Sequence, residues 1–344
     1  MIKEIMTRDY KIDNIKAIAM MLIILAHCEF PLQVNNARSF DVITLVFMST
    51  LVVNPKYIIN KEAFKRKLPK RIKRLLVPTI IFSVCMIIFQ WGVYTRVGRL
   101  DLLSLKTIVN TFLLCEDSIG YVWVIKIFLI NFLCMPLIYY IVKRWKGLFY
   151  HIVILLGSCI LYVILFLVYK KFLSENYLCW IIFHEWILCG LLYLIVAYEA
   201  FYFKNVIQWK KYNIFYWSII LAITILVYRN FSPALDKRSF GIQYLAYSMI
   251  VTYLLLKIVP NKRNRICVWI SKNSMAIYYI HTFFIFILGN GRSVLNIQSI
   301  YFSIFEWFIT ALGSCVLVGL YNRIKSKFMQ KKKYTREIYN AKER

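Results

Sequence analysis

Ten apolar segments recur along the 344 residues of this chain, and each is long enough, or nearly long enough, to cross a lipid bilayer. A helix needs about 20 apolar residues to cross a hydrocarbon layer of roughly 30 Å. Hydrophobic residues make up 60% of the sequence and charged residues only 17%, which excludes an ordinary soluble domain. We therefore expect an all-α polytopic membrane protein of about ten transmembrane helices, near residues 14–31, 40–54, 76–95, 121–142, 149–169, 177–199, 212–230, 240–259, 266–289 and 301–321.

The positive charges lie between these segments. The net charge is +28, and most of the 44 Lys and Arg residues fall in the two terminal segments and in alternate loops. Because cytoplasmic loops are enriched in Lys and Arg, this pattern predicts both termini in the cytoplasm and basic loops against anionic membrane lipid. A nucleic-acid-binding protein would carry its basic face on a soluble domain, so we expect no nucleic-acid partner.

The sequence is consistent with a single membrane domain, residues 1–344, without a soluble domain. Residues 322–344 are basic and polar, and we expect them to form a frayed cytoplasmic tail. The nine cysteines occur singly, mostly inside apolar segments, without a C-x-x-C pair. We interpret them as small apolar side chains and expect neither a disulfide framework nor a metal site.

The first apolar segment, DNIKAIAMMLIILAHCEFP, carries a cation near its start and a histidine near its far end. Lys16 and His27 are 11 residues apart. In one helix they would share a face, about 16 Å apart along the axis, and Asp13 could pair with Lys16 one turn away. A histidine at membrane depth is costly unless it faces a bundle interior, so it marks a candidate site. The alternative is a structural histidine bonded to a neighbouring helix.

Six titratable groups are expected at similar depth in the outer half of the membrane. They are His27, Lys126, His184, Glu185, His281 and Glu306. Because exposure of so many to lipid is implausible, we expect them to converge on a common cavity. Ser274, Tyr278 and His281 follow helical spacing and should share one face. Any single member could instead be a satisfied structural group, His184 and Glu306 in particular.

This arrangement suits acyl transfer from a phosphorylated donor. A neutral histidine can take a proton from a hydroxyl group, and a nearby carboxylate or tyrosine can orient it. Arg71 and Arg74, one turn apart at the end of the basic loop 56–78, can hold phosphate oxygens, although lipid attraction explains most of that loop's charge. A coenzyme A thioester held there and at Lys16 could reach along the first helix towards His27.

The sequence resembles the acyltransferase-3 family of bacterial membrane O-acyltransferases, which are typically ten-helix proteins that acylate sugars of surface polysaccharides. The family opens with an Asp, an Arg three residues later, and a His eleven residues after the Arg. Asp13, Lys16 and His27 match this pattern, with Lys in place of Arg. The family's R-x-x-R element before a proline-led span is matched by Arg71 and Arg74, followed by Pro78.

Later elements of the family pattern are present too. The S-x-x-x-Y-x-x-H element is intact as Ser274, Tyr278 and His281, and the aromatic element is represented by Tyr121 and Trp123. In the second span, the F-x-x-S-G element is reduced to Phe-Met-Ser-Thr at 47–50. The resemblance covers essentially the whole chain.

The resemblance implies transfer of an acetyl or other short acyl group from acyl-CoA to a hydroxyl of a cell-surface glycan or its lipid-linked precursor, at the bacterial inner membrane. Acetyl-CoA would be the donor substrate and the saccharide the acceptor, and a homodimer is compatible with the sequence. The residues and the resemblance together give these candidate roles: catalytic, His27, His281, Tyr278 and Glu185; donor binding, Asp13, Lys16, Arg71, Arg74 and Ser274; acceptor binding, Tyr121, Trp123, Lys126 and Glu306; metal binding, none.

Two other functions remain open at this point. A transporter or flippase of a lipid-linked glycan could use the same polar layer to bind sugar and protons, and would make Arg71 and Arg74 dispensable. A signalling or scaffold protein would leave the polar layer unexplained. Covalent change of the acceptor separates the enzyme from both.

Overall fold

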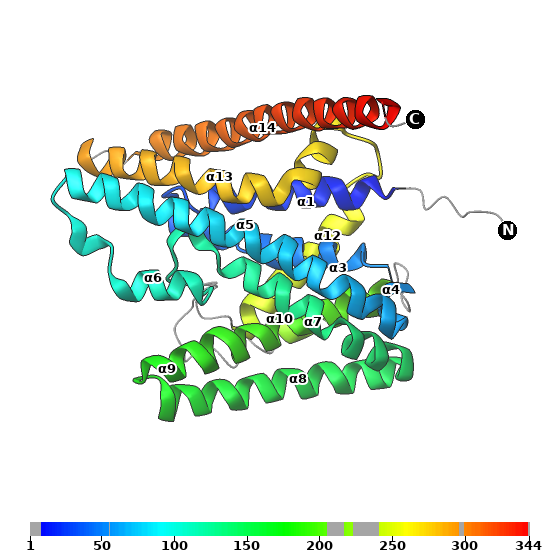
Figure 1. Ribbon diagram of the computed structural model, residues 1–344. Coiled ribbons are helices and arrows are strands. Elements are labelled where there is room, and N and C mark those ends of the chain that lie inside the picture. Colours follow the sequence, from blue (N-terminus) through cyan, green and yellow to red (C-terminus); the bar gives the residue numbers. More distant parts are fainter. Residues whose placement is uncertain (1–7, 55, 205–216, 223–240, 296–298, 343–344) are drawn as a thin grey trace.

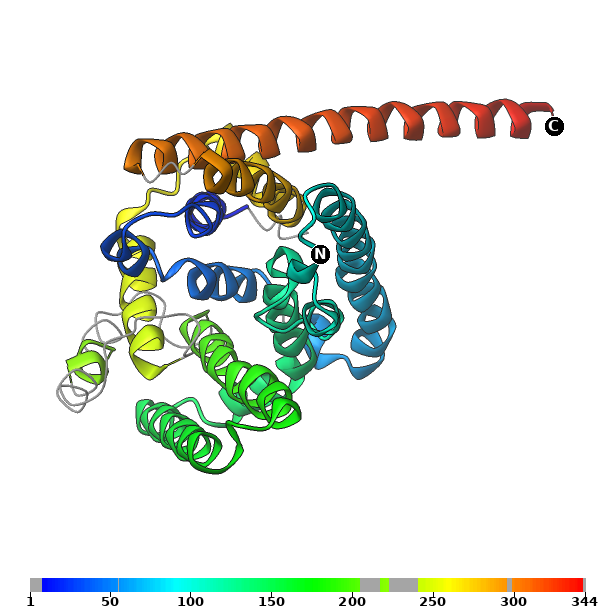
Figure 2. The ribbon, with the colours of Figure 1, turned by 90° about the vertical axis from the view of Figure 1, so that its left-hand side faces the viewer.

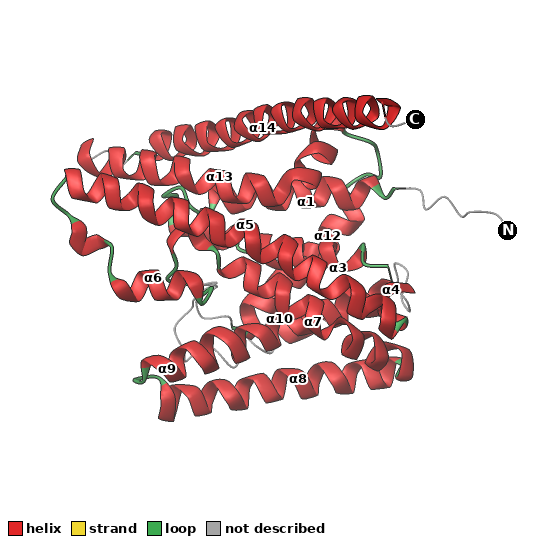
Figure 3. Ribbon diagram, viewed as in Figure 1, coloured by secondary structure: helices red, strands yellow, loops and turns green. Residues whose placement is uncertain are grey.

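The computed structural model of the protein describes residues 8–54, 56–204, 217–222, 241–295 and 299–342. Across these ranges the chain consists of helices joined by loops, without a strand (Figure 3). The α-helices are α1 (Tyr10–Leu25), α2 (Leu32–Ala37), α3 (Asp41–Leu51), α4 (Lys56–Ile59), α5 (Lys61–Arg96), α6 (Leu105–Phe112), α7 (Trp123–Arg144), α8 (Leu148–Val168), α9 (Tyr177–Cys179), α10 (Cys189–Tyr202), α12 (Ile242–Ile258), α13 (Arg265–Leu295) and α14 (Ile300–Lys342). Short helical segments of other pitch are η1 (Leu100–Leu102), η2 (Ile119–Tyr121), η3 (Tyr169–Leu173) and η4 (Trp180–Leu188), of which the last two are π-helical.

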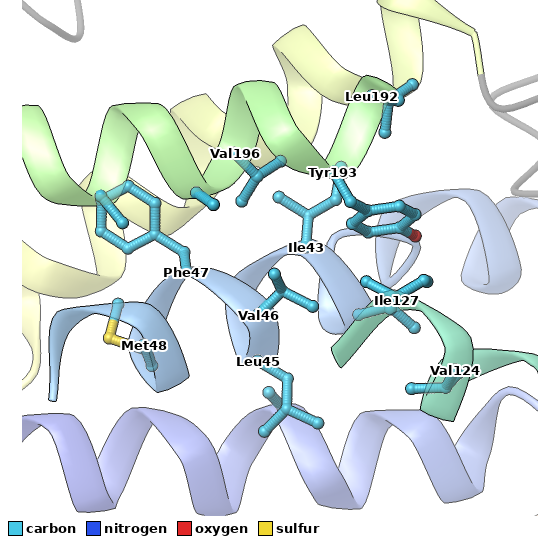
Figure 4. Close-up of a cluster of buried hydrophobic side chains, with 14 of the residues drawn as sticks. Ile43, Leu45, Val46, Phe47, Met48, Val124, Ile127, Leu192, Tyr193 and Val196 are labelled. Carbon is cyan, nitrogen blue, oxygen red and sulfur yellow. The ribbon is translucent and has the colours of Figure 1, made fainter. Parts of the chain in front are cut away.

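The short helix α3 lies at the centre of the bundle. It contacts α1, α7, α10 and α12, and all but one of its eleven residues are buried. Figure 4 shows its side chains Ile43 and Val46 between residues of α7 and α10, and Phe47 against α10 and away from α7. Since lipid tails are as apolar as these side chains, close packing rather than exclusion of water holds such helices together.

The longest apolar helices lie around this centre. Among the described residues, six helices are long and apolar enough to cross a membrane: Glu62–Arg96, Ile119–Arg144, Leu148–Leu173, Tyr177–Tyr202, Arg265–Arg292 and Ile300–Phe328. On α8 and α14 many large apolar side chains are exposed, as expected of surfaces that face lipid. The protein is thus an all-α, multi-pass membrane protein.

The predicted count of ten spans agrees only in part with these helices. The six long helices correspond to six of the ten predicted segments, and Ile242–Ile258 is a shorter apolar helix in a seventh. α1 and α3 have 16 and 11 residues, too few to cross a bilayer as straight helices. The predicted span 212–230 falls mostly outside the described residues.

The bundle has two distinct ends. In Figure 1 the start of α1, the α7–α8 turn, the α12–α13 loop and the end of α14 lie on the right. The end of α5, helix α6, the start of α9 and the start of α14 lie on the left. The named segments that are predicted to be cytoplasmic therefore share one end, and the named segments predicted outside share the other. Which end faces the cytoplasm stays a prediction.

The basic tail differs from the expectation of a frayed segment. α14 continues as one helix of 43 residues to Lys342, because residues after 321 lack Gly and Pro and favour helix. Its C-terminal half extends beyond the bundle (Figure 2).

Candidate active site

His27 lies in a turn and not on the first helix. α1 ends at Leu25, and the His27 amide donates to the Ile24 carbonyl at 3.1 Å, a turn-type bond. The prediction of a helix continuing past His27 is therefore wrong. If the helix continued, the carbonyls of this segment would accept from its own amides. Here they accept from side chains elsewhere in the chain: Arg38 donates to Ala26 O at 3.4 Å, and Ser303 Oγ donates to Glu29 O at 2.7 Å.

Aromatic rings and a second histidine surround the His27 ring. The Tyr121 ring stacks on it with centroids 3.8 Å apart, and the His281 ring lies 5.4 Å away. The Tyr278 ring is 5.3 Å from that of His281, and its hydroxyl donates to the Tyr121 carbonyl. Three segments far apart in sequence thus meet here: the end of α1, η2 and α13.

Tyr121 is held in an unusual backbone conformation. Its φ is +57°, and Gly120 before it has φ +71°. Residues other than glycine rarely adopt such backbone angles, which cost about 1–3 kcal/mol. A Cβ at Gly120 would also meet Cε1 of Phe82 at 2.5 Å. The glycine therefore allows η2 to fit closely against Phe82, with Tyr121 turned against His27.

His281 is fully buried, with 0% of its surface exposed. Neither ring nitrogen has a hydrogen-bond partner of normal geometry among the described residues, although the Ile277 and Tyr278 carbonyls lie near the ring. Leaving buried polar atoms unbonded is unfavourable, and native proteins do so rarely. Beside a second histidine, such a group is suited to exchange a proton or to bind a substrate atom.

A second cluster contains Lys126, Glu185 and His184. Lys126 Nζ donates to Glu185 Oε2 at 2.8 Å, and both side chains are fully buried. The same oxygen accepts from the Glu116 amide at 2.8 Å, and His184 Nδ1 lies 3.3 Å from Glu185 Oε1. His184 and Glu185 belong to the π-helical segment η4, a form of helix frequent at functional sites.

Glu306 belongs to a third group, together with Arg292. Arg292 Nε lies 3.0 Å from Glu29 Oε2, and its NH1 lies 3.5 Å from Glu306 Oε2 and 3.1 Å from Ser303 Oγ. The contacts thus divide the six predicted groups into three sets rather than one shared cluster. Charge pairing explains this, since a buried ion is stable only beside its counter-ion.

The start of α1 carries the basic groups. Asp13 accepts from Arg8 at 2.5 and 2.9 Å and from Ser271 Oγ at 2.7 Å. Its partner is therefore Arg8, and the predicted pairing with Lys16 is wrong, although Lys16 lies within electrostatic range of Asp13, Arg8 and Arg71.

Arg71 and Arg74 lie on the same helix, α5. Both are exposed, and the Arg71 guanidinium carbon is 4.4 Å from the centre of the Phe132 ring. Arg71 lies within electrostatic range of both Lys16 and Arg74. The structure thus gathers three predicted donor-binding cations, and no carboxylate pairs with them at short range among the described residues.

Two other predicted residues lie beside these sets. Ser274 is half-buried on α13, one turn before Tyr278. Trp123 begins α7 and is buried in the hydrophobic core, with 6% of its surface exposed.

Sequence reasoning missed three charged residues. Arg8, Glu29 and Arg292 each form an ion pair with a site group or close to one. Glu29 and Arg292 were expected near segment ends, where charge is ordinary. A signal was available for Glu29, two residues after His27, but none for its pairing with Arg292, which is 263 residues away.

The geometry at the two ends of α1 suits a group-transfer reaction. His27 and His281 can take up and pass on a proton. The cations at the start of α1 can hold phosphate oxygens through charge-assisted hydrogen bonds.

The chain matches the family model described as an acyltransferase domain over residues 9–323. A comparison with curated proteins and another with solved structures gave no match. The matched region includes every candidate site residue except Arg8. Because it covers nearly the whole chain, the protein belongs to the acyltransferase-3 family.

Proposed function

We propose that the protein is a membrane O-acyltransferase that moves an acetyl or other short acyl group from acyl-CoA to a hydroxyl of a cell-surface glycan or its lipid-linked precursor, in the bacterial inner membrane. The supporting observation is the presence of two sites along α1: the cations Lys16, Arg71 and Arg74 near its start and the His27–His281 pair beyond its end. Family membership supports the acyltransferase chemistry. The donor and the acceptor are the proposal.

The donor would enter at the start of α1. Lys16, Arg71 and Arg74 would hold its phosphates, and Arg8 and Ser271 keep the Asp13 carboxylate engaged nearby. From Lys16 to the helix end at Leu25 is about 14 Å at the rise of an α-helix. An extended thiol arm on the donor would carry the thioester along this length to His27.

At His27 the acceptor hydroxyl would attack the thioester carbonyl. His27 takes the hydroxyl proton as the new C–O bond forms, and the C–S bond then breaks. The thiolate leaves and is protonated, so that the products are an acyl ester and the free thiol. His281, whose ring is 5.4 Å away, can accept the proton in turn, with Tyr278 beside it. The alternative is that His27 itself carries the acyl group for a time.

The remaining predicted residues would position the acceptor. Lys126 and Glu185 form a buried ion pair. Each would hydrogen-bond the acceptor while it keeps its partner in the pair. Glu306 is tied through Arg292 to Glu29, close to the His27 turn. The Tyr121 ring, which stacks on the His27 ring, would form one side of the acceptor site.

The test is transfer of label from acetyl-CoA to glycan in isolated membranes, with and without the protein. We expect label in glycan only where the protein is present. In the Arg71→Ala/Arg74→Ala variant the KM for acetyl-CoA should rise at least about tenfold, because charge-assisted hydrogen bonds to phosphate are worth about 1.5–3 kcal/mol each.

The matched control is Lys70→Ala/Lys73→Ala, which removes two exposed cations at the same spacing on α5. This variant should keep the wild-type KM for acetyl-CoA. An equal rise in both double variants would mean that overall positive charge, and not a phosphate site, holds the donor. Glycan export that depends on the protein without any labelled ester would favour a flippase instead.

A further inference from the structure

Three aromatic rings form a row that leads inward along α9 and η4. The Tyr177 and Trp180 rings lie 5.9 Å apart with 16° between their planes, and the Trp180 and His184 rings lie 6.4 Å apart at 14°. Tyr177 is exposed, while Trp180 and His184 are half-buried. We call these three residues the aromatic row.

A buried amide lies beside the outer end of the row. The Tyr177 hydroxyl donates to Oδ1 of Asn110 on α6 at 2.5 Å. Asn110 is 1% exposed, and its Nδ2 has no hydrogen-bond partner among the described residues. Lys106, one turn earlier on α6, places its Nζ 5.0 Å from the Tyr177 ring centre. The Asn110 amide and the Lys106 cation thus lie next to the exposed ring of Tyr177.

The inner end of the row is joined to the catalytic histidine. His184 contacts Glu185, which binds Lys126 of α7 and the amide of Glu116. Residues 116 and 126 flank η2, whose Tyr121 ring stacks on His27. The row therefore runs from an exposed position to the segment that forms one side of the His27 site.

Interfacial anchoring is the simplest alternative for Tyr177 and Trp180, since such residues are enriched at membrane surfaces. Anchoring does not require the rings to be nearly parallel, nor a buried amide with a free donor beside them. It also does not explain why the row ends at a buried ion pair. Together these features are typical of a ligand site, in which apolar faces and a few fixed polar groups share the contact.

We propose that the aromatic row binds the saccharide chain of the acceptor, an inference that rests on the proposed function. The apolar C–H faces of sugar rings pack on Tyr177 and Trp180, and ring hydroxyls accept from Asn110 Nδ2. His184 and the Lys126–Glu185 pair receive the inner sugar unit. This positions a hydroxyl at His27, while the rest of the chain leaves past Tyr177.

The experiment measures steady-state label transfer in membranes against glycan concentration and, separately, against acetyl-CoA concentration. Trp180→Ala should raise the KM for glycan about tenfold, the loss expected for one aromatic contact, and leave the KM for acetyl-CoA unchanged. Trp180→Phe keeps a ring and should stay close to wild type. Tyr301→Ala is the matched control, because Tyr301 is 80% exposed at the start of α14, at the same end of the bundle.

Each outcome decides the proposal. A raised glycan KM in Trp180→Ala alone, with an unchanged thermal unfolding midpoint, supports the row. An unchanged glycan KM overturns it, as does an equal loss of transfer and of thermal stability in Trp180→Ala and Tyr301→Ala, which would indicate anchoring.

Failure of the proposed function can be distinguished from failure of the aromatic row to bind saccharide. If wild-type membranes transfer no label, binding is measured instead, by saturation-transfer NMR on the purified protein with glycan fragments from the same cells. Binding in wild type that Trp180→Ala removes still supports the row. Absent binding, or equal binding by both proteins, overturns it.

Discussion

Two buried histidines in this bundle, His151 and His281, differ in what surrounds their ring nitrogens. In His151, on α8, Nε2 lies 3.2 Å from Glu199 Oε1 and Nδ1 lies 3.2 Å from the Tyr198 hydroxyl. Its ring also stacks on that of Tyr202, with centroids 3.7 Å apart. In His281 neither nitrogen has a partner of normal geometry among the described residues, and the rings of Tyr278 and His27 lie 5.3 and 5.4 Å away.

Under the proposed function, this difference is the one expected between a structural histidine and a functional one. A buried polar group that is fully bonded adds to stability and has no capacity left for a ligand. A buried group with free nitrogens weakens the fold, and is tolerated where a substrate or a proton supplies the missing partner. Both histidines lie in helices that are long and apolar enough to cross a membrane, so that property alone does not distinguish them. The four substitutions below test this contrast.

The largest effect is expected for His27→Ala. Removing a general base typically lowers the rate by about 10²–10⁴-fold, and loss of an acyl carrier would lower it at least as much. We expect this loss in acyl transfer from labelled acetyl-CoA, with the thermal unfolding midpoint within error of wild type. Retained activity would contradict the assignment of His27.

His281→Phe should have the next largest effect. Phenylalanine keeps a ring of similar size but removes both nitrogens, so transfer should fall about 100-fold. The unfolding midpoint should be equal or higher, because two unbonded polar atoms leave the interior. A stability loss without an activity loss would make His281 structural.

Gly120→Ala tests the positioning of Tyr121 and should lower transfer about tenfold. The added Cβ costs about 1–3 kcal/mol at a positive φ and forces Phe82 to move. Gly157→Ala, inside α8 with nothing within 4 Å, is the control and should be neutral or slightly stabilising. Equal activity of both variants would mean that the site tolerates a displaced Tyr121.

The smallest effect on activity is expected for His151→Phe, the same substitution at the structural histidine. Transfer per folded protein should change by less than about twofold. The free energy of unfolding should fall by about 1–3 kcal/mol, because the buried Tyr198 hydroxyl loses its bond to His151 and the Glu199 carboxylate loses its close neighbour. An activity loss as large as that of His281→Phe would remove the distinction between the two sites.

Much of the fold and of the His27 site could be anticipated from the sequence. Hydropathy predicted an all-helical membrane protein, and the spacing of Ser274, Tyr278 and His281 placed them together on one helix. The family resemblance linked that helix to His27, and the structure brings His27 and His281 together. These predictions depend on local periodicity, or on residues that act together in a family pattern.

Some predictions that needed tertiary contacts were wrong. The turn that ends α1 at Leu25 is held by Arg38 and Ser303, which no local pattern indicates. The pairings of Lys126 with Glu185 and of Arg292 with Glu306 place the six predicted groups in separate contact sets, which the sequence did not indicate. His151 received no role, because its partner Glu199 is 48 residues away and no spacing rule connects them.

The contacts that hold α1 have a consequence for how the protein is made. Asn14 donates to the carbonyls of Pro260 and Lys262, and the Trp307 indole donates to that of Met21. Ribosomes add about 5–20 residues per second, so His27 emerges well before Ser303, which helps to fix its turn, by tens of seconds at the slower rates. During that interval α1 can pack on α3, and its contacts with α13 and α14 form last. The proposed site is therefore completed late, when the last helix is inserted, and a chain stopped before α14 lacks the Ser303 and Trp307 contacts that hold the end of α1.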